Sequence, residues 1–494
     1  MSLQPSRHAR WLVLALLALP LAASFASAPV PRERAPAPAA PALDRPRRAD
    51  PRPARIRHLV VGGGPSPDGN EVEIERTVAA AHRAFGEDTV VLFAGGSDTR
   101  SVQVEDGSAA ADPLLRALGE LFAPRPARDA RYRPTTLPVV HGPAELGVLE
   151  ATLEEAFAAG GPLDLVLVGH GSPADAPSEA AFLTWGGVPL DALGLDALLG
   201  EAPPRPVRVI ATHCYAGGLA ELAFAGADEK AGPSAAARCG LFATTWDREA
   251  AGCDADPQRR SDGWAAHFFA ALAGQGPEGG ALDGLDLDGD GRISGLEAHA
   301  QARAASRSID VPTSTSVRLL RALAPASGPE VPVSLPDEEA VVRRLSEALD
   351  ERAAHEADAR AGELEASLGE LEAEREELEA ESDAAWTALT SALLSRWPVL
   401  DDPYHPDFAR TFEAERTAIQ RFLDDSGDRA ELDALADRLG ALDAAAEGLE
   451  LELALLERLL AAHETLALAA RLRAAGGQDW ARYERLRACE AGLP

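Results

Sequence analysis

Positive charge is scarce in this 494-residue sequence. Lys230 is the only lysine, and 47 basic residues stand against 79 acidic ones, which gives a formal net charge of −32. The summed field of such a surface repels polyanions, so the composition argues against nucleic acid or acidic lipid as a partner. The near absence of lysine, with abundant alanine, arginine, glycine and proline, indicates the codon bias of a GC-rich bacterial genome.

Cysteine is also rare, with only Cys214, Cys239, Cys253 and Cys489 in the chain. A disulfide scaffold would show more cysteines in a shorter chain, so that class is excluded. Cys239 and Cys253 flank a predicted strand at residues 240–245, which alone separates them by about 20 Å, whereas a disulfide needs Cα atoms within about 7 Å. Only a returning loop could join them, and the sequence therefore predicts free thiols.

Long apolar runs are lacking outside the N-terminus. Arg7 and Arg10 precede an apolar run over residues 11–23, and small residues follow it. This order predicts a secretory signal peptide over residues 1–28, cleaved after Ala28 or Ser24, and hence export to the periplasm or cell envelope of a bacterium. An uncleaved membrane anchor over residues 11–28 is the alternative. The proline- and arginine-rich residues 29–55 cannot form a core and predict an extended linker.

Short β-rich apolar runs alternate with helical patterns between residues 56 and 325. Such alternation predicts an α/β domain with a mostly parallel sheet flanked by helices. In sheets of this kind, reactive groups gather at the carboxyl ends of the strands. The apolar runs cover residues 56–61, 89–93, 163–168, 207–211 and 240–245, and the helical patterns cover residues 71–85, 144–159, 191–199, 217–226 and 263–272.

A proline-rich hinge at residues 326–336 ends this domain, and residues 337–494 are predicted to be helical almost throughout. Leucines keep a spacing of three and four from Leu364 to Leu378 and again from Leu432 to Leu460, which predicts a coiled-coil seam. Prolines between the two helices favour an antiparallel hairpin, with self-association between chains as the alternative. Because few contacts should cross an exposed hinge, the hairpin should be separable from the α/β domain.

Two of the predicted strands end beside residues that can carry chemistry. Strand 163–168 is followed by His170 and Gly171, and strand 207–211 is followed by Cys214. If these strands are parallel neighbours, His170 and Cys214 emerge at the same edge of the sheet. Amide hydrolysis needs a nucleophile, a group that carries protons and donors for an oxyanion, and glycine backbone can supply the donors.

A His-Gly after one strand and a Cys after the next, about forty residues later, resembles the signature of the legumain–caspase superfamily of cysteine peptidases. Residues 241–256 look like the legumain strand and loop that follow the catalytic cysteine. Residues 63–70 and 309–316 look like segments of bacterial caspase-like proteins. The resemblance covers about 260 residues, from residue 57 to residue 320.

The resemblance implies Cys214 as the nucleophile, His170 as the catalytic histidine and Gly171 as the source of an oxyanion amide. It also implies that Asp256 lines the primary substrate pocket, where it could accept an asparagine amide or a basic side chain. The alternative for Asp256 is a solvated loop carboxylate, since many acids surround it. The family's other pocket residues do not align cleanly with residues 70–76, which leaves the preferred substrate residue open.

Two other histidines are weaker candidates. His141 stands in a second His-Gly dipeptide, but it precedes a helix and has no long strand behind it. His213 points to the opposite face of its strand from Cys214 by alternation, which predicts a structural role and also argues against a zinc site. A serine hydrolase is set aside because no Gly-x-Ser-x-Gly elbow follows a strand.

Residues 286–297, DLDGDGRISGLE, form a full EF-hand loop sequence. Acids occupy positions 1, 3, 5 and 12, and glycine at position 6 permits the sharp turn. The pattern predicts a single, structural Ca²⁺ site, because no EF-hand helix clearly precedes the loop; an acidic turn at the start of a helix is the alternative. The predicted ligands are Asp286, Asp288, Asp290, Arg292 through its carbonyl, Ser294 and Glu297.

The sequence thus favours an exported cysteine endopeptidase that cleaves protein or peptide substrates through Cys214 and His170. The alternative is a catalytically silent, peptidase-like envelope scaffold that uses its coiled coil for protein–protein interaction.

Overall fold

The computed structural model describes residues 52–53, 55–105, 112–122, 130–200, 206–351 and 353–492. The predicted signal peptide, residues 1–28, lies outside these ranges, as does the predicted linker except for its last few residues. Within the part of the chain that is described, no helix is both long and apolar enough to cross a bilayer.

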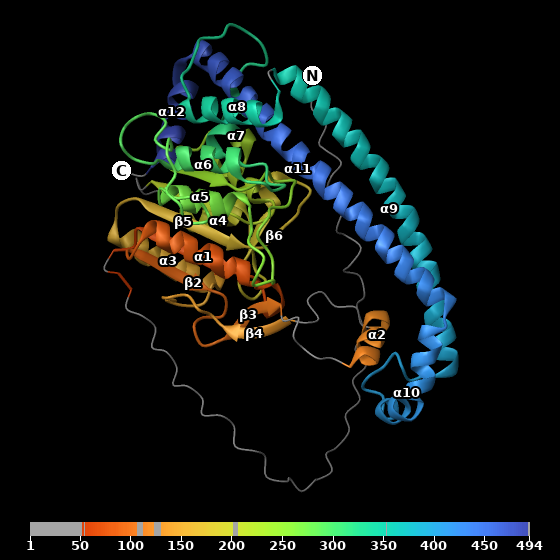
Figure 1. The fold of residues 1–494 in the computed structure, drawn as a ribbon. Helices are drawn as coiled ribbons and strands as arrows, with labels where there is room; N and C mark the ends of the chain where they lie inside the picture. The colour runs from red at the N-terminus through yellow and green to blue at the C-terminus, as the bar shows by residue number, and fades with distance from the viewer. Residues whose placement is uncertain are drawn as a thin grey trace.

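Six strands form one central sheet, in the order β11-β10-β9-β5-β1-β2 (Figure 1). Every neighbouring pair is parallel except β10 and β11, which are antiparallel. The prediction of an α/β domain with a mostly parallel sheet is therefore confirmed. The strands are β1 His58–Gly63, β2 Thr89–Phe93, β5 Leu163–Gly169, β9 Val207–Ala211, β10 Arg238–Phe242 and β11 Thr313–Ser314.

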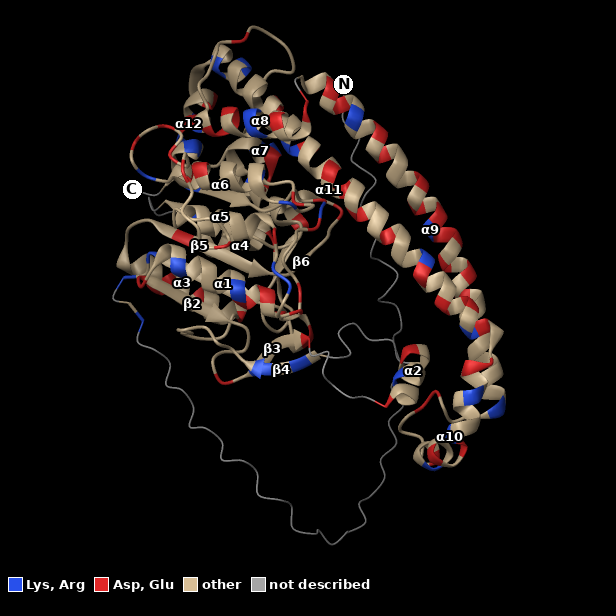
Figure 2. Cartoon of the chain, viewed as in Figure 1, with Lys and Arg blue, Asp and Glu red and all other residues tan. Residues whose placement is uncertain are grey.

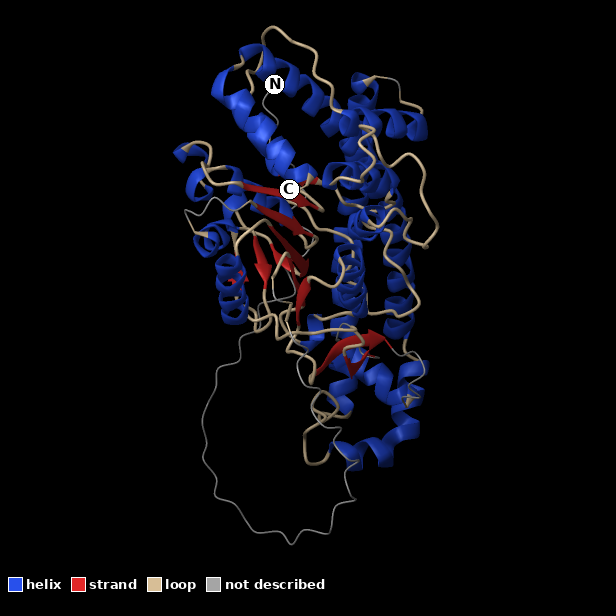
Figure 3. Cartoon of the chain, turned by 90° about the vertical axis from the view of Figure 1, so that its left-hand side faces the viewer, coloured by secondary structure: helices blue, strands red, loops and turns tan. Residues whose placement is uncertain are grey.

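The strand sequences are continuously apolar because helices cover both faces of the sheet (Figure 3). One face packs against α1 Val72–Phe85, α5 Trp264–Leu272 and α6 Gly295–Ala305. The other face packs against α3 Leu146–Ala159, α4 Ala192–Leu199 and the 3₁₀ helix η3 Ala216–Ala223. The domain therefore has three layers, with the sheet between two layers of helices and one apolar core on each face of the sheet.

Short elements surround the sheet at its edges. Strands β3 Arg100–Glu105 and β4 Ala130–Pro134 pair with each other, and α2 Pro113–Phe122 lies between them in the sequence. A second small sheet joins β6 Gly171–Ser172, β7 Ala181–Leu183 and β8 Pro189–Leu190. The other 3₁₀ helices are η1 Pro67–Gly69, η2 Pro177–Glu179, η4 Ala225–Ala227 and η5 Glu229–Ala231.

The C-terminal region is helical, as predicted. Its helices are α8 Pro336–Leu349, α9 Ala354–Arg396, α10 Phe408–Asp424, α11 Gly427–Ala475 and α12 Gly477–Ala491; α7 Thr315–Leu323 lies before the predicted hinge. Helices α9 and α11 lie side by side and run in opposite directions; we call α9 to α11 the helical arm (Figure 1). In the apolar seam, Leu378 and Leu435 belong to one cluster, and Leu368 and Leu456 belong to another. Acidic residues recur along α9 and α11 (Figure 2).

The far end of the helical arm is covered by α2, a segment the sequence did not identify as a helix. Leu114, Leu118 and Leu121 of α2 join an apolar cluster with residues of α9 and α10. Trp386 donates its indole N–H to the Leu121 carbonyl at 2.9 Å, and Arg416 pairs with Asp112 at 2.6 Å. The arm therefore contacts the α/β domain at its tip as well as at its base.

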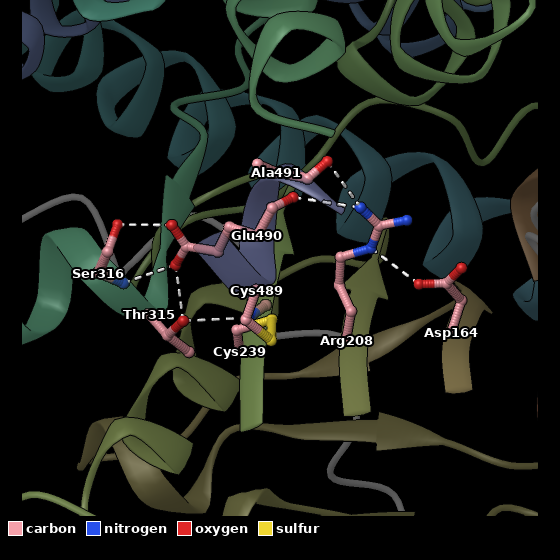
Figure 4. Close-up of a disulfide and its surroundings, with 9 residues drawn as sticks. Asp164, Arg208, Cys239, Thr315, Ser316, Cys489, Glu490 and Ala491 are labelled. Atoms are coloured by element: carbon pink, nitrogen blue, oxygen red, sulfur yellow. Dashed lines mark hydrogen bonds and ion pairs between the residues drawn. A yellow bond between two sulfur atoms is a disulfide. The ribbon is translucent and has the colours of Figure 1, made fainter. Parts of the chain in front are cut away.

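At the base, the end of the chain returns to the sheet and is covalently joined to it. Cys489 of α12 forms a disulfide with Cys239 of β10, so the prediction of free thiols is wrong for this pair (Figure 4). Cys214 and Cys253 are free thiols, as predicted. The prediction that Cys239 and Cys253 do not pair is correct. Nothing in the sequence indicated the Cys239–Cys489 bond, because its two cysteines are 250 residues apart and share no local pattern.

Buried polar contacts also cross the predicted hinge. The Glu490 carboxylate is fully buried and accepts hydrogen bonds from the Thr315 hydroxyl, the Ser316 amide and the Ser316 hydroxyl at 2.6–2.7 Å. Arg208 of β9 donates to the carbonyls of Glu490 and Ala491 while its Nε contacts Asp164 at 2.8 Å (Figure 4). The expectation that few contacts cross residues 326–336 is therefore wrong, since the last helix completes the amino-terminal edge of the sheet.

Candidate active site

The two residues proposed as a dyad lie at the same edge of the sheet. Strands β5 and β9 are adjacent and parallel, with Leu167 opposite Ala211. His170 comes directly after β5, and Cys214 comes three residues after the end of β9. The sequence-based expectation that neighbouring strands bring these residues to one edge is confirmed.

Gly171 allows the two strand ends to approach closely. A Cβ atom at this position would lie 1.9 Å from the Cys214 carbonyl oxygen and 2.6 Å from Nδ1 of His213, so no larger residue fits. The backbone of the residue after His170 is thus packed directly against the backbone of Cys214.

Cys214 opens a tight turn between β9 and η3. The next residue, Tyr215, has a left-handed backbone with φ of 62°, and its amide donates to the Arg248 carbonyl at 2.8 Å. A non-glycine residue with positive φ carries strain of about 1 kcal/mol or more, and such strain is concentrated at functional sites. The turn projects the cysteine from the end of the strand while η3 is buried behind it.

The Cys214 thiol is held neutral by its surroundings. The Ala250 amide donates to Sγ at 3.3 Å, and the thiol faces the Ala250 carbonyl at 3.7 Å. Burial raises the pKa of Cys214 to about 11; the Ala250 hydrogen bond lowers it by less than burial raises it, and the charges of Glu249 and Asp310 raise it further. At neutral pH the sulfur is therefore a protonated thiol.

His170 has a carboxylate partner that the sequence analysis did not identify. Its Nε2 lies 2.9 Å from Oε2 of Glu71, the residue that precedes α1, and both side chains are largely buried. Burial lowers the pKa of His170, but the hydrogen bond and charge of Glu71, together with the Gly69 carbonyl, outweigh it and raise the pKa above its ordinary value. Glu71 therefore orients the ring and stabilises its protonated form.

A signal for Glu71 was present in the sequence. It follows the loop after β1, and β1 is the strand next to β5, which carries His170. The loops after neighbouring parallel strands lie at the same edge, so an acid at the start of the first helix was a candidate partner. The pairing of Glu71 with His170 could be predicted only once β1 and β5 were known to be neighbours.

The other two histidines have structural roles. His213 is buried, and its Nδ1 donates to the Cys214 carbonyl at 2.8 Å; burial lowers its pKa to about 4, so the ring is neutral. His141 is also buried, and its Nδ1 accepts a hydrogen bond from the Val91 amide of β2 at 3.0 Å. His213 fixes the backbone of Cys214, whereas His141 ties a loop to the edge strand.

Asp256 does not contact His170 or Cys214 in the hydrogen bonds of the described residues. Its Oδ1 accepts from the Gln258 amide at 2.7 Å, and its own amide donates to Asp254 at 2.8 Å. The surrounding loop is fixed to the start of α1 by Arg76, which donates to the Pro257 and Arg259 carbonyls. The hydrogen bonds of Asp256 thus stay within its own loop.

The EF-hand-type loop, residues 286–297, leads into α6 and includes its first turn. One carboxylate oxygen from each of Asp286, Asp288 and Asp290 lies within 4.8 Å of the others, which suits the oxygen-rich shell that Ca²⁺ prefers. Glu297 accepts hydrogen bonds from the Leu287, Asp288 and Ser294 amides, so it already closes the loop onto the helix. The Ser294 hydroxyl caps α6, and the Arg292 amide bonds to Asp290.

No protein-family model and no curated protein matches this chain. The geometry itself provides a free thiol, a histidine with raised proton affinity, a carboxylate that orients it and glycine backbone at close range. These groups can form a covalent bond to a carbonyl carbon and move a proton to a leaving group.

Proposed function

We propose that this chain is an exported cysteine endopeptidase similar to the legumain–caspase superfamily. One observation carries the proposal: His170 and Cys214 follow adjacent parallel strands, with the backbone of Gly171 packed against that of Cys214. The Glu71–His170 contact supports it, because the carboxylate orients the ring and raises its affinity for a proton. The substrate would be an extended protein or peptide segment presented at this edge of the sheet.

In the proposed reaction, Cys214 loses its proton to His170 as the sulfur attacks the carbonyl carbon of the scissile peptide. A C–S bond forms, and the carbonyl oxygen gains a negative charge that backbone amides near Gly171 stabilise. The imidazolium then gives its proton to the leaving amine, and the C–N bond breaks. Water hydrolyses the resulting thioester, releasing the carboxylate product and restoring the thiol. Glu71 offsets the positive charge on His170 in both half-reactions.

The disulfide supports the proposed location. Disulfides persist in oxidising compartments such as the bacterial periplasm and are rare in the cytosol. A bond between Cys239 and Cys489 is consistent with the secretory signal expected over residues 1–28. We therefore place the mature protein in the periplasm or cell envelope.

Calcium is part of the proposal as a structural ion. The carboxylates of Asp286, Asp288 and Asp290 would hold it, with the Arg292 carbonyl, Ser294 and Glu297 as the expected additional ligands. Bound Ca²⁺ would supply positive charge that relieves repulsion among these acids and stiffen the segment leading into α6. It has no role in the proposed proton transfers.

A silent scaffold is the second candidate, and the neutral thiol is the observation that favours it. A sulfur with a pKa of about 11, held by Ala250, reacts slowly unless substrate binding changes its surroundings. In that case the helical arm would provide the function by binding partner proteins.

The deciding experiment uses an acyloxymethyl ketone activity probe with a peptide recognition element, followed by mass-spectrometric mapping. The peptidase proposal expects modification at Cys214, loss of labelling in His170→Ala, and hydrolysis of a mixed fluorogenic peptide library that Cys214→Ala abolishes. Cys253, the other free thiol, is the internal control for nonspecific alkylation. Equal labelling of both cysteines with no hydrolysis would favour the scaffold.

A further inference from the structure

The loop over Cys214 is connected to the helical arm. We call residues 246–263, between β10 and α5, the cysteine loop. Its Ala250 contacts Sγ of Cys214, and its Arg248 accepts the amide hydrogen of Tyr215, the strained residue after the nucleophile. Any displacement of Arg248 or Ala250 therefore changes the position or surroundings of the sulfur.

Glu457 of α11 holds Arg248 from outside the domain. The two side chains form a bidentate ion pair, with Nη1 to Oε2 at 2.5 Å and Nη2 to Oε1 at 2.6 Å. Their exposed fractions are 19% for Arg248 and 24% for Glu457, so the pair is partly shielded from water. Paired hydrogen bonds of this kind fix the angle of the guanidinium as well as its distance.

The neighbouring residue on α11 supports the same loop by another route. Arg458 is fully buried and donates to the carbonyls of Arg303, Ser306, Ser308 and Asp310 at 2.5–3.2 Å. The Asp310 carboxylate in turn accepts from the Ala251 amide and the Trp264 amide, both at 2.7 Å. The cysteine loop is thus held near both of its ends by a segment that Arg458 organises.

These two charged residues are not explained by the stability of the arm. A coiled-coil seam needs apolar residues at its contact positions and is indifferent to a carboxylate directed at a distant loop. A buried guanidinium is costly unless it is hydrogen-bonded, and the carbonyl partners of Arg458 all lie in residues 303–310 outside the arm. Both residues instead point from the arm into the layer that supports Cys214.

We propose that α11 is a positioning element for the nucleophile, with Glu457 and Arg458 as the positioning residues. Through Arg248 and Asp310 they fix the Tyr215 turn and the Ala250 contact, so the helical arm sets the reactivity of Cys214. A role of Glu457 and Arg458 in catalysis rests on the proposed function. Their effect on the accessibility and reactivity of the Cys214 sulfur does not depend on that function.

The test compares Glu457→Gln with Glu464→Gln on the same helix. Glu464 pairs with Arg321 of α7, is seven residues further along α11 and has an exposed pair with no contact to the cysteine loop. Each variant loses one carboxylate charge and keeps its shape. The full-length protein is used throughout, because the helices are built into the fold. Arg458 is unsuitable for the test, since removing its guanidinium leaves four buried carbonyls without a donor.

Two measurements are made on each variant: the rate of Cys214 alkylation by iodoacetamide, followed by peptide mapping, and kcat and KM for a peptide substrate. Glu457→Gln should change the alkylation rate severalfold and lower kcat about tenfold with KM little changed, because a misplaced catalytic group costs rate more than binding. Glu464→Gln should change neither. The charge exchange Arg248→Glu with Glu457→Arg should restore much of the loss.

The alkylation measurement separates this inference from the proposed function. A wild-type protein without peptidase activity, in which Glu457→Gln still changes Cys214 alkylation, would remove the function and leave the positioning role. An active wild type in which Glu457→Gln and Glu464→Gln behave alike would overturn the positioning role and leave the function. Equal losses in both variants, matched by equal falls in melting temperature, would show that α11 acts only on stability.

Discussion

Glu71 Oε2 lies 2.9 Å from Nε2 of His170, and this contact couples the loop after β1 to the loop after β5. Glu71→Gln should leave a hydrogen-bonding group in place but remove the charge that raises the pKa of His170. Burial, which lowers the pKa of His170, is then no longer offset by the Glu71 charge, so this pKa should fall. An NMR titration of the His170 ring measures the fall directly, and kcat should decrease about tenfold or more.

The same pair predicts a pH dependence of stability. A histidine whose folded-state pKa is raised stabilises the folded protein at pH values below its ordinary pKa, and the contribution disappears as pH rises through the raised value. The difference in melting temperature between wild type and Glu71→Gln should therefore shrink as the pH is raised from mildly acidic to alkaline. A difference that grows with pH would contradict the assignment.

His141 and His170 should respond to alanine substitution in opposite ways. His141→Ala leaves the buried Val91 amide without its acceptor, which should cost about 2 kcal/mol of unfolding free energy. Activity per folded molecule should stay close to that of the wild type. His170→Ala should abolish hydrolysis with a smaller effect on unfolding by urea. Reversed results would mean that the wrong His-Gly was assigned to catalysis.

The disulfide should contribute strongly to stability. It closes a loop of 250 residues, and the loss of chain entropy in the unfolded state predicts a contribution of about 5 kcal/mol. Cys489→Ser, or reduction with dithiothreitol, should lower the urea midpoint of unfolding by an amount that corresponds to this loss of free energy. Cys253→Ser serves as the control, because Cys253 forms no disulfide. Equal midpoints for the wild type and Cys489→Ser would show that the bond is not formed in solution.

Calcium binding is best tested at Asp290. Glu297 also bonds to three backbone amides, so Glu297→Gln would lower stability even without an ion. Asp290→Asn keeps the acceptor for the Arg292 amide and removes one ligand charge. The melting temperature of the wild type should rise by several degrees with millimolar Ca²⁺, because an ion that binds only the folded state stabilises it. The rise should be absent in Asp290→Asn, and calorimetry without heat of binding would exclude the site.

A chain ending at residue 325 should fail to fold, contrary to the separability expected from the sequence. Truncation removes Arg458, Cys489 and Glu490, which leaves buried carbonyls, a β10 thiol and the Ser316 amide without their partners. Each unsatisfied buried group costs about 1–3 kcal/mol, and several together exceed the stability of most domains. Solubility and far-ultraviolet circular dichroism of the truncated chain measure the outcome. A soluble domain with its sheet intact would restore the two-domain description.

The local pattern of apolar residues was enough to predict the central sheet and to predict that His170 and Cys214 follow neighbouring strands. Strands β2 and β9 and the C-terminal ends of α1, α3, α4 and α5 coincide with the predictions, because continuous apolar runs and helical periods reflect burial directly; the four helices start one or two residues later than predicted. Strand β10 begins two residues earlier than predicted, and the expected helix after Cys214 is the 3₁₀ helix η3. The heptad spacing predicted the contact between α9 and α11, and the prolines between them predicted that the two helices are antiparallel.

Features that depend on distant contacts were not predictable in this way. Glu71 required the strand order, and the disulfide required the return of α12. Helix α2 is a different case, because Leu114, Leu118 and Leu121 stand at helical spacing in its sequence and only the partner of this apolar face is distant. The hinge at residues 326–336 has the composition of a linker, but composition does not reveal what the chain does afterwards. Arg458 looked like one more charged residue between leucines, and only the fold shows that it is buried.

The bond between Cys239 and Cys489 closes residues 239–489 into a covalent ring. The cysteine loop, the EF-hand-type loop and the whole helical arm lie within this ring. A protease that cuts the ring once would produce two chains that stay joined by the disulfide, and the fragments would separate on a denaturing gel only after reduction. Maturation by internal cleavage would therefore leave the arm attached to the sheet, and release of the arm would require a reductant or a second cut.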